Sequence, residues 1–420
     1  MTDLLARRQA VLGPNVPTFY ADPVEIVRGE GVWLWDADGK RYLDCYNNVP
    51  HVGHCHPKVV EAITRQAATL NTHTRYLHPG IVEYGERLTA TFSNDLSQMI
   101  MVCTGSEAND IALRMAQAVT GKTGVVATDN TYHGNTVATA ALSTRRPPIG
   151  GYPDHVRLVP APDTLRPLGG SAEAQGRAFA DQVTEAAAEL EARGHGFSGL
   201  MICPTFANEG LHDLPRDFLQ PVARAVKAAG GLLLVDEVQP GFGRTGTGMW
   251  AHDWAGIAPD VVTLGKPMAN GHPTAAVMAR PDVMAAFRNA FGYFNTFGGN
   301  PVSCAASMAV LDILEEDGLI AHAADVGNYT LTQLKTLSHP AIANVRGMGQ
   351  FYAIELEIDG TPATALAAQV VEAMKDRGVL MGAGGRKQHT LKIRPPMPFD
   401  RSNADLLVAR LQESLDACPT

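Results

Sequence analysis

A lysine and an aspartate follow two apolar runs in the middle of the chain. The run LLLVDEVQ, residues 232–239, places Asp236 at the end of one predicted buried strand, and VVTLGK, residues 261–266, places Lys266 at the end of another. In an open α/β sheet, side chains at the carboxyl ends of strands face the crevice in which ligands bind. A lysine amine can form a Schiff base with an aldehyde, and an aspartate can pair with a pyridinium nitrogen. The pair therefore predicts a site for pyridoxal 5′-phosphate (PLP).

A glycine and a serine open a predicted helix directly after another apolar run. Gly105 and Ser106 belong to the segment TGSEAND, residues 104–110. Glycine lets the backbone approach an anion, and the unpaired N–H groups and dipole of a helix start attract a phosphate. An ordinary N-cap with an acidic first turn is the alternative. The presence of Asp236 and Lys266 favours the phosphate cradle.

Three other side chains, and one loop, are candidates for ligand contacts on weaker patterns. Tyr132 follows the next predicted strand and could stack on a flat ring, or it could be an aromatic at the edge of the core. Lys392 and Arg394 stand at alternate positions, so they share one face of a predicted strand; a solvated basic face is the commoner outcome for such a pair. The loop NTFGGNP, residues 295–301, could contact an anion or merely connect two elements.

Two motifs resemble ligand sites but lack the context that such sites need. GFGRTG, residues 241–246, fits G-x-G-x-x-G, but no strand leads directly into it and no clear helix follows, which argues against a dinucleotide site. His51, His54 and His56 lie close together in a turn, but no second cluster stands at zinc-like spacing. We expect no metal site.

Short apolar runs alternate with helical patterns over the middle of the chain. The expected strands are Met99–Cys103, Gly124–Ala127, Val156–Val159, Gly199–Cys203, Leu232–Val235, Val261–Leu264 and Ala275–Met278. The expected helices between them are Glu107–Val119, Ala172–Arg193 and Pro215–Ala229. This alternation predicts an α/β fold with a mainly parallel sheet that is covered on both faces.

The last third of the chain has a different pattern, which predicts a smaller α+β domain. The expected elements are helices at Asn300–Glu315 and Thr364–Arg377, and strands at Tyr352–Glu357 and Thr390–Ile393 that alternate as in a one-sided sheet. The stretch Ile26–Cys45 is expected to join this domain. The predicted divisions are an N-terminal segment at 1–55 that contributes to the small domain, a large PLP-binding domain at 56–304 and a small C-terminal domain at 305–420.

Composition narrows the class of protein. The chain has 420 residues, 45% of them hydrophobic and 18% charged, which is enough for a sizeable core. A net charge of −9 without like-charge runs weighs against nucleic-acid and anionic-membrane binding. No apolar run approaches the ~20 residues of a membrane span. The N-terminus lacks a signal-peptide core, so we expect a cytoplasmic protein whose six scattered cysteines are reduced.

These motifs, in this order and over nearly the whole chain, resemble the class III aminotransferase group of PLP enzymes. The segments that carry the resemblance are Tyr42–Cys45 through Gly53–Pro57, Gly105–Asn109, Tyr132–Gly134, Asp236–Gln239, Gly241–Gly246, Lys266 and Thr296–Pro301. The resemblance implies the aspartate-aminotransferase-like fold, fold type I. It also implies a homodimer with active sites at the subunit interface.

The resemblance further implies how PLP is held. It implies that Lys266 forms the Schiff base, that Asp236 pairs with the ring nitrogen and that Gln239 bonds the ring hydroxyl. Tyr132 and Val238 would contact the two faces of the ring, and Gly105 and Ser106 would hold the phosphate. Thr296 would contact the phosphate of the PLP in the neighbouring subunit.

A narrower resemblance points to the phospho-lyase branch of this group. It is carried by Asn47–Asn48, Gly265–Pro273, Asn300–Cys304 and Leu391–Met397. This branch acts on ethanolamine phosphate or 5-phosphohydroxylysine. It implies β-elimination of phosphate from ethanolamine phosphate, giving acetaldehyde, ammonia and phosphate, with a small phosphorylated amine as substrate.

Two departures from the transaminase pattern bear on the substrate. Lys392 stands where these transaminases usually have an arginine that clamps the substrate α-carboxylate, and a lysine lacks the planar fork that binds carboxylate bidentately. Cys203 stands where a glutamate before proline is usual. Lys392 and Arg394 are our candidates for holding the leaving phosphate. The alternatives are a class III ω-amino aminotransferase and a 5-phosphohydroxylysine phospho-lyase. A PLP-binding protein without turnover is disfavoured by the intact Lys266 and Asp236.

Overall fold

The computed structural model describes residues 2–93, 95–145 and 147–418. Its largest sheet has seven strands in the order β4-β10-β9-β8-β7-β5-β6. The strands are β4 (Gln98–Val102), β5 (Gly124–Thr128), β6 (Val156–Val159), β7 (Phe197–Ile202), β8 (Leu232–Asp236), β9 (Val261–Leu264) and β10 (Ala275–Ala279). Only β10 runs antiparallel to its neighbours in this sheet. The predicted mainly parallel sheet is confirmed, as are all seven strand positions to within two residues.

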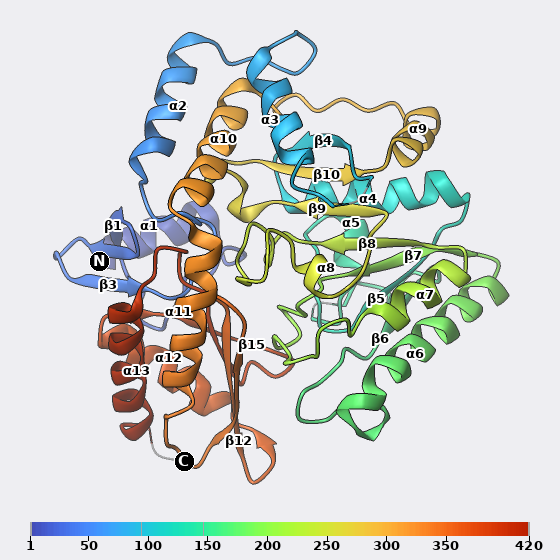
Figure 1. Ribbon diagram of the computed structural model, residues 1–420. Helices are drawn as coiled ribbons and strands as arrows, with labels where there is room; N and C mark the ends of the chain where they lie inside the picture. Colours follow the sequence, from blue (N-terminus) through green and yellow to red (C-terminus); the bar gives the residue numbers. More distant parts are fainter. Residues whose placement is uncertain (1, 94, 146, 419–420) are drawn as a thin grey trace.

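Helices cover both faces of this sheet (Figure 1). One face packs on α4 (Gly105–Thr120) and α9 (Pro281–Ala290), and the other on α6 (Ala172–Ala192) and α7 (Gln220–Ala228). The strands are therefore apolar at successive positions, since Leu234 faces one layer and Val235 the other.

The remaining helices lie outside these two layers. They are α1 (Thr2–Leu12), α2 (Pro57–Thr69), α3 (Pro79–Thr89), α5 (Val137–Ala140), α8 (Ala251–Trp254), α10 (Pro301–Glu316), α11 (Leu319–Leu334), α12 (Thr364–Asp376) and α13 (Arg401–Asp416), with short 3₁₀ helices η1 (Leu168–Gly170) and η2 (Lys266–Ala269). Helix α10 packs on α2, α3 and η2, so it supports the segment that carries Lys266. Among the described residues, no helix combines the length and the apolar character needed to cross a membrane.

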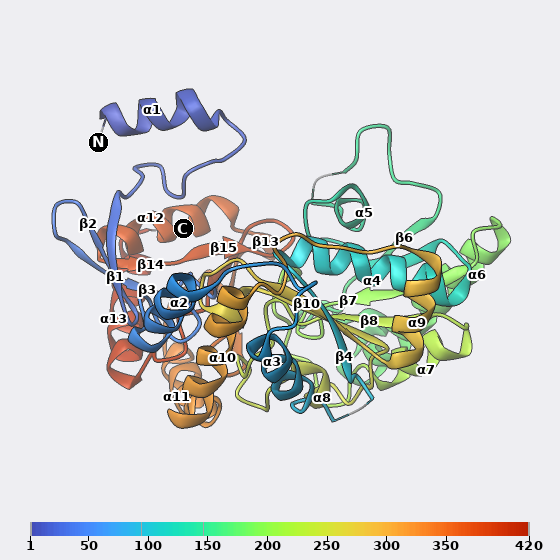
Figure 2. The same ribbon diagram turned by 90° about the horizontal axis from the view of Figure 1, so that it is seen from above.

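Two smaller sheets bring the ends of the chain together. One contains β1 (Ile26–Glu30), β2 (Trp33–Asp36), β3 (Arg41–Asp44) and β14 (Val379–Leu380); the other contains β11 (Ile342–Gly347), β12 (Tyr352–Ile358), β13 (Thr361–Pro362), β15 (Gly382–Gly384) and β16 (Thr390–Ile393). Strand β14 pairs in parallel with β3, so the N-terminal strands lie against the C-terminal part, as expected (Figure 2). The predicted boundary at 304/305 falls within α10, and the division into domains stays a prediction.

Two expectations for individual elements are wrong. Strands β12 and β16 are not one-sided, because residues 352–356 and 390–393 are buried without alternation. One face packs on the C-terminal helices, while Ala353 packs against Ala207 and Leu211 from the larger part of the molecule. Helix α7 begins five residues later than predicted, since Asp217 takes a left-handed conformation at φ 62°.

Candidate active site

The ends of two neighbouring parallel strands bring Asp236 and Lys266 together. Asp236 is the last residue of β8, and Lys266 begins η2 two residues after the end of β9. In the register of the two strands, Asp236 lies opposite Thr263. The strand-end geometry predicted from the sequence is therefore present in the structure.

Hydrogen bonds hold the Asp236 carboxylate in a buried position. Its Oδ2 accepts from His133 Nδ1 at 2.7 Å and from Asn109 Nδ2 at 3.0 Å, and its Oδ1 accepts from the backbone N–H of Val238 at 2.9 Å. Burial alone would raise the pKa of Asp236, but the hydrogen bond and charge of His133, followed by Val238 N–H and Lys266, lower it below its ordinary value. Asp236 is thus an ionised acceptor at neutral pH.

The protonated side chain of Lys266 loses its proton more readily than an exposed lysine does. Burial lowers the pKa of Lys266 to about 8, with Asp236 opposing this shift and Arg394 adding to it. A substantial fraction of the amine is therefore neutral near physiological pH. A neutral amine can attack an aldehyde carbon or accept a proton.

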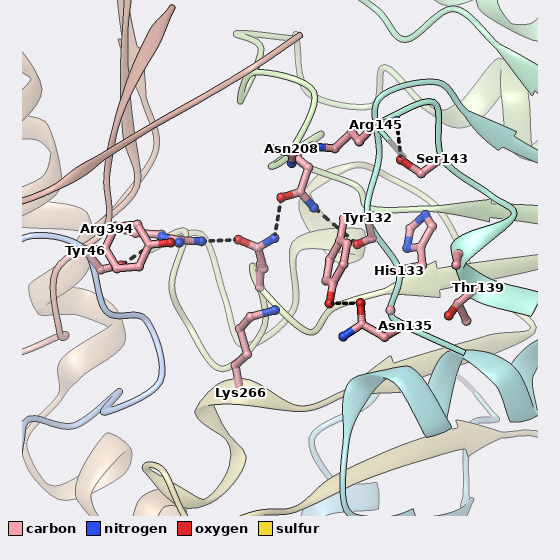
Figure 3. A pocket seen from close by; sticks show the side chains of 13 residues that line it. Tyr46, Tyr132, His133, Asn135, Thr139, Ser143, Arg145, Asn208, Lys266 and Arg394 are labelled. Carbon is pink, nitrogen blue, oxygen red and sulfur yellow. Dashed lines mark hydrogen bonds between the residues drawn. The ribbon is translucent and has the colours of Figure 1, made fainter. Parts of the chain in front are cut away.

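A cavity of about 440 Å³ opens beside Lys266, large enough for a small ligand (Figure 3). It is lined by Tyr46, Tyr132, His133, Gly134, Asn135, Thr139, Ala140, Ser143, Arg145, Asn208, Gln239, Lys266 and Arg394. The predicted residues Tyr132, Gln239, Lys266 and Arg394 are thus brought together around one space.

A chain of hydrogen bonds crosses this cavity. Arg394 Nη1 donates to Gln239 Oε1 at 2.7 Å, and Gln239 Nε2 donates to Asn208 Oδ1 at 3.2 Å. Asn208 Nδ2 in turn reaches the backbone oxygen of Tyr132 at 3.4 Å. The Gln239 amide is therefore fixed between a cation and a second amide.

Lys392 and Arg394 are both buried, so they do not form a solvated basic face. Arg394 lies 4.6 Å from the ring of Tyr46 and donates from Nε to the Tyr46 backbone oxygen at 3.0 Å. Lys392 instead donates to the backbone oxygen of Ala207 at 2.5 Å and is not among the cavity-lining residues. Of the two predicted cations, only Arg394 borders the cavity.

The start of α4 offers unpaired backbone donors. Thr104 caps the helix by accepting from the N–H of Glu107, and within the described residues no acceptor takes the N–H groups of Gly105 and Ser106. A side chain at 105 would be crowded, since its Cβ would lie 3.1 Å from both methyl groups of Val238. These features agree with the predicted phosphate cradle, although Gly105, Ser106 and Val238 do not line the cavity itself.

Thr296 lies away from the cavity of its own chain. It occupies an exposed loop between α9 and α10. Its predicted contact with a neighbouring subunit stays a prediction.

Several lining residues were missed by the sequence reasoning. Asn208 follows β7 and could have been found by the rule that strand ends carry ligand contacts. Tyr46 and Arg145 lie in irregular segments, where no pattern marks them.

The two motifs that were rejected as ligand sites, GFGRTG and the histidine cluster, make hydrogen bonds within the protein. Arg244, inside GFGRTG, is fully buried and donates to the backbone oxygens of Pro395 and Gln350, and its guanidinium contacts His51 Nδ1. His54 bonds to the Asp44 carboxylate at 2.7 Å. The glycine-rich segment forms consecutive turns rather than the start of a helix.

The residues around the cavity fit PLP. The free N–H groups at the start of α4 suit its phosphate, the ionised Asp236 suits a protonated ring nitrogen, and the Lys266 amine suits its aldehyde. Tyr132 lines the cavity and is 42% exposed, so its ring is available for stacking on a flat ligand.

Comparisons with known proteins identify the family. The class III aminotransferase family model matches residues 18–415. The chain is 38% identical to a Drosophila melanogaster protein named alanine–glyoxylate aminotransferase 2-like, over 99% of this chain and 87% of that one. It is 35% identical to a Caenorhabditis elegans protein named ethanolamine-phosphate phospho-lyase homolog 1, over 98% and 93% of the two chains.

A solved structure supports the same family. A phospholyase from Arthrobacter, in complex with phosphoethanolamine, is 44% identical and superposes with a TM-score of 0.95, over 99% of this chain and 100% of that one. The predicted fold type I and the predicted PLP cofactor are confirmed by these similarities. The chain belongs to the class III aminotransferase family of PLP-dependent enzymes.

Proposed function

We propose that this enzyme is a phospho-lyase that eliminates phosphate from ethanolamine phosphate and yields acetaldehyde, ammonia and phosphate. The observation that carries the proposal is the charge of the cavity. Among the described residues its lining contains the guanidinium groups of Arg145 and Arg394 and the Lys266 amine, and no aspartate or glutamate. Such a lining favours a dianionic phosphate over a neutral or cationic group. The similarity to a phospholyase that binds phosphoethanolamine supports the same substrate class.

Two buried residues outside the cavity lining, Lys392 and Cys203, disfavour an α-carboxylate substrate. The Lys392 amine is engaged with the backbone of Ala207, and a lysine cannot bind a carboxylate bidentately. Burial, with the charges of Asp236 and Glu209, raises the pKa of the Cys203 thiol to about 12, so Cys203 stays neutral where a glutamate was expected. A transaminase that alternates between two amino donors would use the arginine that is usual at position 392 and the glutamate that is usual at position 203.

The chain supplies a base and a counter-charge for the proposed reaction. When bound, PLP supplies an electron sink for the pair released by breaking a C–H bond. Lys266 Nζ takes the proton from the carbon that bears the substrate nitrogen, and Asp236 holds negative charge at the ring nitrogen. In the substrate, the C–O bond then breaks and its electron pair leaves on the phosphate. One water is consumed overall and no keto acid is needed.

We assign the cofactor contacts as the family resemblance implies. Gly105 and Ser106 hold the cofactor phosphate, Gln239 the ring hydroxyl, and Tyr132 and Val238 the ring faces. Arg394 is the principal contact for the substrate phosphate, because it borders the cavity and Lys392 does not. Lys392 lies outside this lining, and burial together with Arg394 and Lys266 lowers its pKa well below the usual lysine value.

We propose that the enzyme works as a homodimer in which Thr296 reaches the neighbouring site. Exposed apolar side chains gather near this loop: Leu77 is fully exposed and Phe297 is 69% exposed. The two segments lie together, since His73 packs edge-on against Phe294 at 5.8 Å. An apolar surface of this kind is typical of a subunit interface.

A class III aminotransferase is the second candidate, favoured by the name of the Drosophila relative. The two functions are separated by comparing kcat/KM for phosphate release from ethanolamine phosphate with kcat/KM for alanine in the presence of glyoxylate. Our proposal predicts that the first is larger. A larger value for alanine would overturn the proposal and support the aminotransferase.

A further inference from the structure

Arg145 is a cation that lines the cavity. It lies five residues after the end of α5 and borders the same space as Lys266 and Arg394. Within the described residues, no carboxylate or other acceptor contacts its guanidinium; only its backbone N–H is bonded, to Ser143 Oγ at 3.1 Å. Figure 3 shows Arg145 and Arg394 entering the site from different segments of the chain.

The two arginines differ in how firmly they are held. Arg394 is buried, stacks on Tyr46 and donates to Gln239, so its position is set before a ligand arrives. Arg145 is exposed, and its side chain has no such restraint. Its charge nevertheless reaches the interior, since it contributes to lowering the pKa of Lys392, after burial, Arg394 and Lys266.

Two other exposed arginines form ion pairs with nearby carboxylates. Arg386 pairs with Asp129, and Arg401 pairs with Asp325 at 2.9 Å. Arg145 faces a cavity whose lining residues include no such group. An anionic ligand that enters this cavity can therefore supply a counter-charge for Arg145.

We infer that Arg145 binds the substrate phosphate together with Arg394 and receives the phosphate as it leaves. The inference rests on the proposed function. When the C–O bond breaks, its electron pair leaves on the phosphate oxygen, and the proton from the neighbouring carbon is on Lys266 Nζ. A planar guanidinium can pair with two oxygens of the departing anion. Because Arg145 is exposed, it can follow the phosphate toward solvent, which the fixed Arg394 cannot.

The test compares Arg145→Gln and Arg145→Lys with the control Arg288→Gln. Arg288 is an exposed arginine on α9 that does not line the cavity. In the holoenzyme, Arg145→Gln should raise both the KM for ethanolamine phosphate and the inhibition constant for inorganic phosphate by about tenfold, the lower end of a charge-assisted hydrogen bond. Both constants should be intermediate in Arg145→Lys, and both should match the wild type in Arg288→Gln. PLP content and absorbance should be unchanged in all three.

Two results would overturn the inference. One is an inhibition constant for phosphate in Arg145→Gln within about twofold of the wild type. The other is loss of PLP from Arg145→Gln, which would place Arg145 at the cofactor instead.

If the proposed function is wrong, the outcome differs from both of these results. If the wild type releases no phosphate from ethanolamine phosphate, inorganic phosphate is titrated into the holoenzyme by calorimetry. Weaker binding in Arg145→Gln than in the wild type then still supports the anion site. Equal binding, or no binding to the wild type, overturns it.

Discussion

Replacing Asp236 by asparagine removes one charge and keeps nearly the same shape. Both carboxylate oxygens accept hydrogen bonds in the structure: Oδ2 from His133 and Asn109, and Oδ1 from the N–H of Val238. An asparagine has one acceptor oxygen, so its NH₂ group must face at least one of these donors. One buried donor therefore loses its acceptor.

The consequences for stability and for turnover have different sizes. An unsatisfied buried donor costs about 1–3 kcal/mol. For a chain of 420 residues this lowers Tm by only about 1–3 °C. Loss of a charge-assisted hydrogen bond to the ring nitrogen costs a further ~1.5–3 kcal/mol in the transition state, which lowers kcat about 10- to 150-fold. Asp236→Asn should therefore keep its fold and its PLP but lose most activity.

The assay measures Tm, PLP content and phosphate release for Asp236→Asn beside the control Asn109→Ala. Asn109 donates to Asp236 and accepts from Thr263, so its removal disturbs the same network while leaving the carboxylate charge in place. Asn109→Ala should lower Tm about as much as Asp236→Asn does, but its kcat should fall far less. Equal loss of kcat in both variants, or near-wild-type turnover in Asp236→Asn, would refute the argument from charge.

Four further outcomes are expected. Lys266→Ala should abolish turnover and the borohydride-sensitive attachment of PLP; attachment that persists would contradict the role of Lys266. Because the pKa of Lys266 is about 8 and only the neutral amine attacks an aldehyde, covalent capture of PLP by the apoenzyme should speed up as pH rises through about 8; a midpoint above about 10 would argue against the buried amine. Lys392→Arg should raise alanine-dependent transamination relative to elimination, because a guanidinium can bind carboxylate bidentately, and an unchanged ratio would show that this position does not select the substrate. Thr296→Ala should weaken PLP retention, and mixing it with Lys266→Ala should form hybrid dimers in which one site has both residues intact; PLP affinity equal to the wild type would disprove the cross-subunit contact.

The elements of the larger sheet could be predicted because each strand is a continuous apolar run that ends at a turn. Strand β9, for example, has the predicted bounds Val261–Leu264, and the rule for strand ends placed Asp236 and Lys266 at one site. The burial of both faces at residues 352–356 and 390–393 could not be predicted, since the covering residues Ala207 and Leu211 are distant in sequence.

The cavity wall was harder to predict than the strand ends. Tyr46 and Arg394 meet there although 348 positions separate them in the sequence. Arg145 lies in an irregular loop whose path no periodicity describes. Such contacts depend on how the C-terminal part packs on the larger sheet, which local sequence patterns do not encode.

The central claim is elimination without an amino acceptor, and product stoichiometry tests it most directly. The holoenzyme is incubated with ethanolamine phosphate alone, and phosphate, acetaldehyde and ammonia are measured over many turnovers. We predict equal amounts of the three products, in large excess over enzyme and with no keto acid present. No phosphate release, together with formation of alanine from an amine donor once pyruvate is added, would contradict the account.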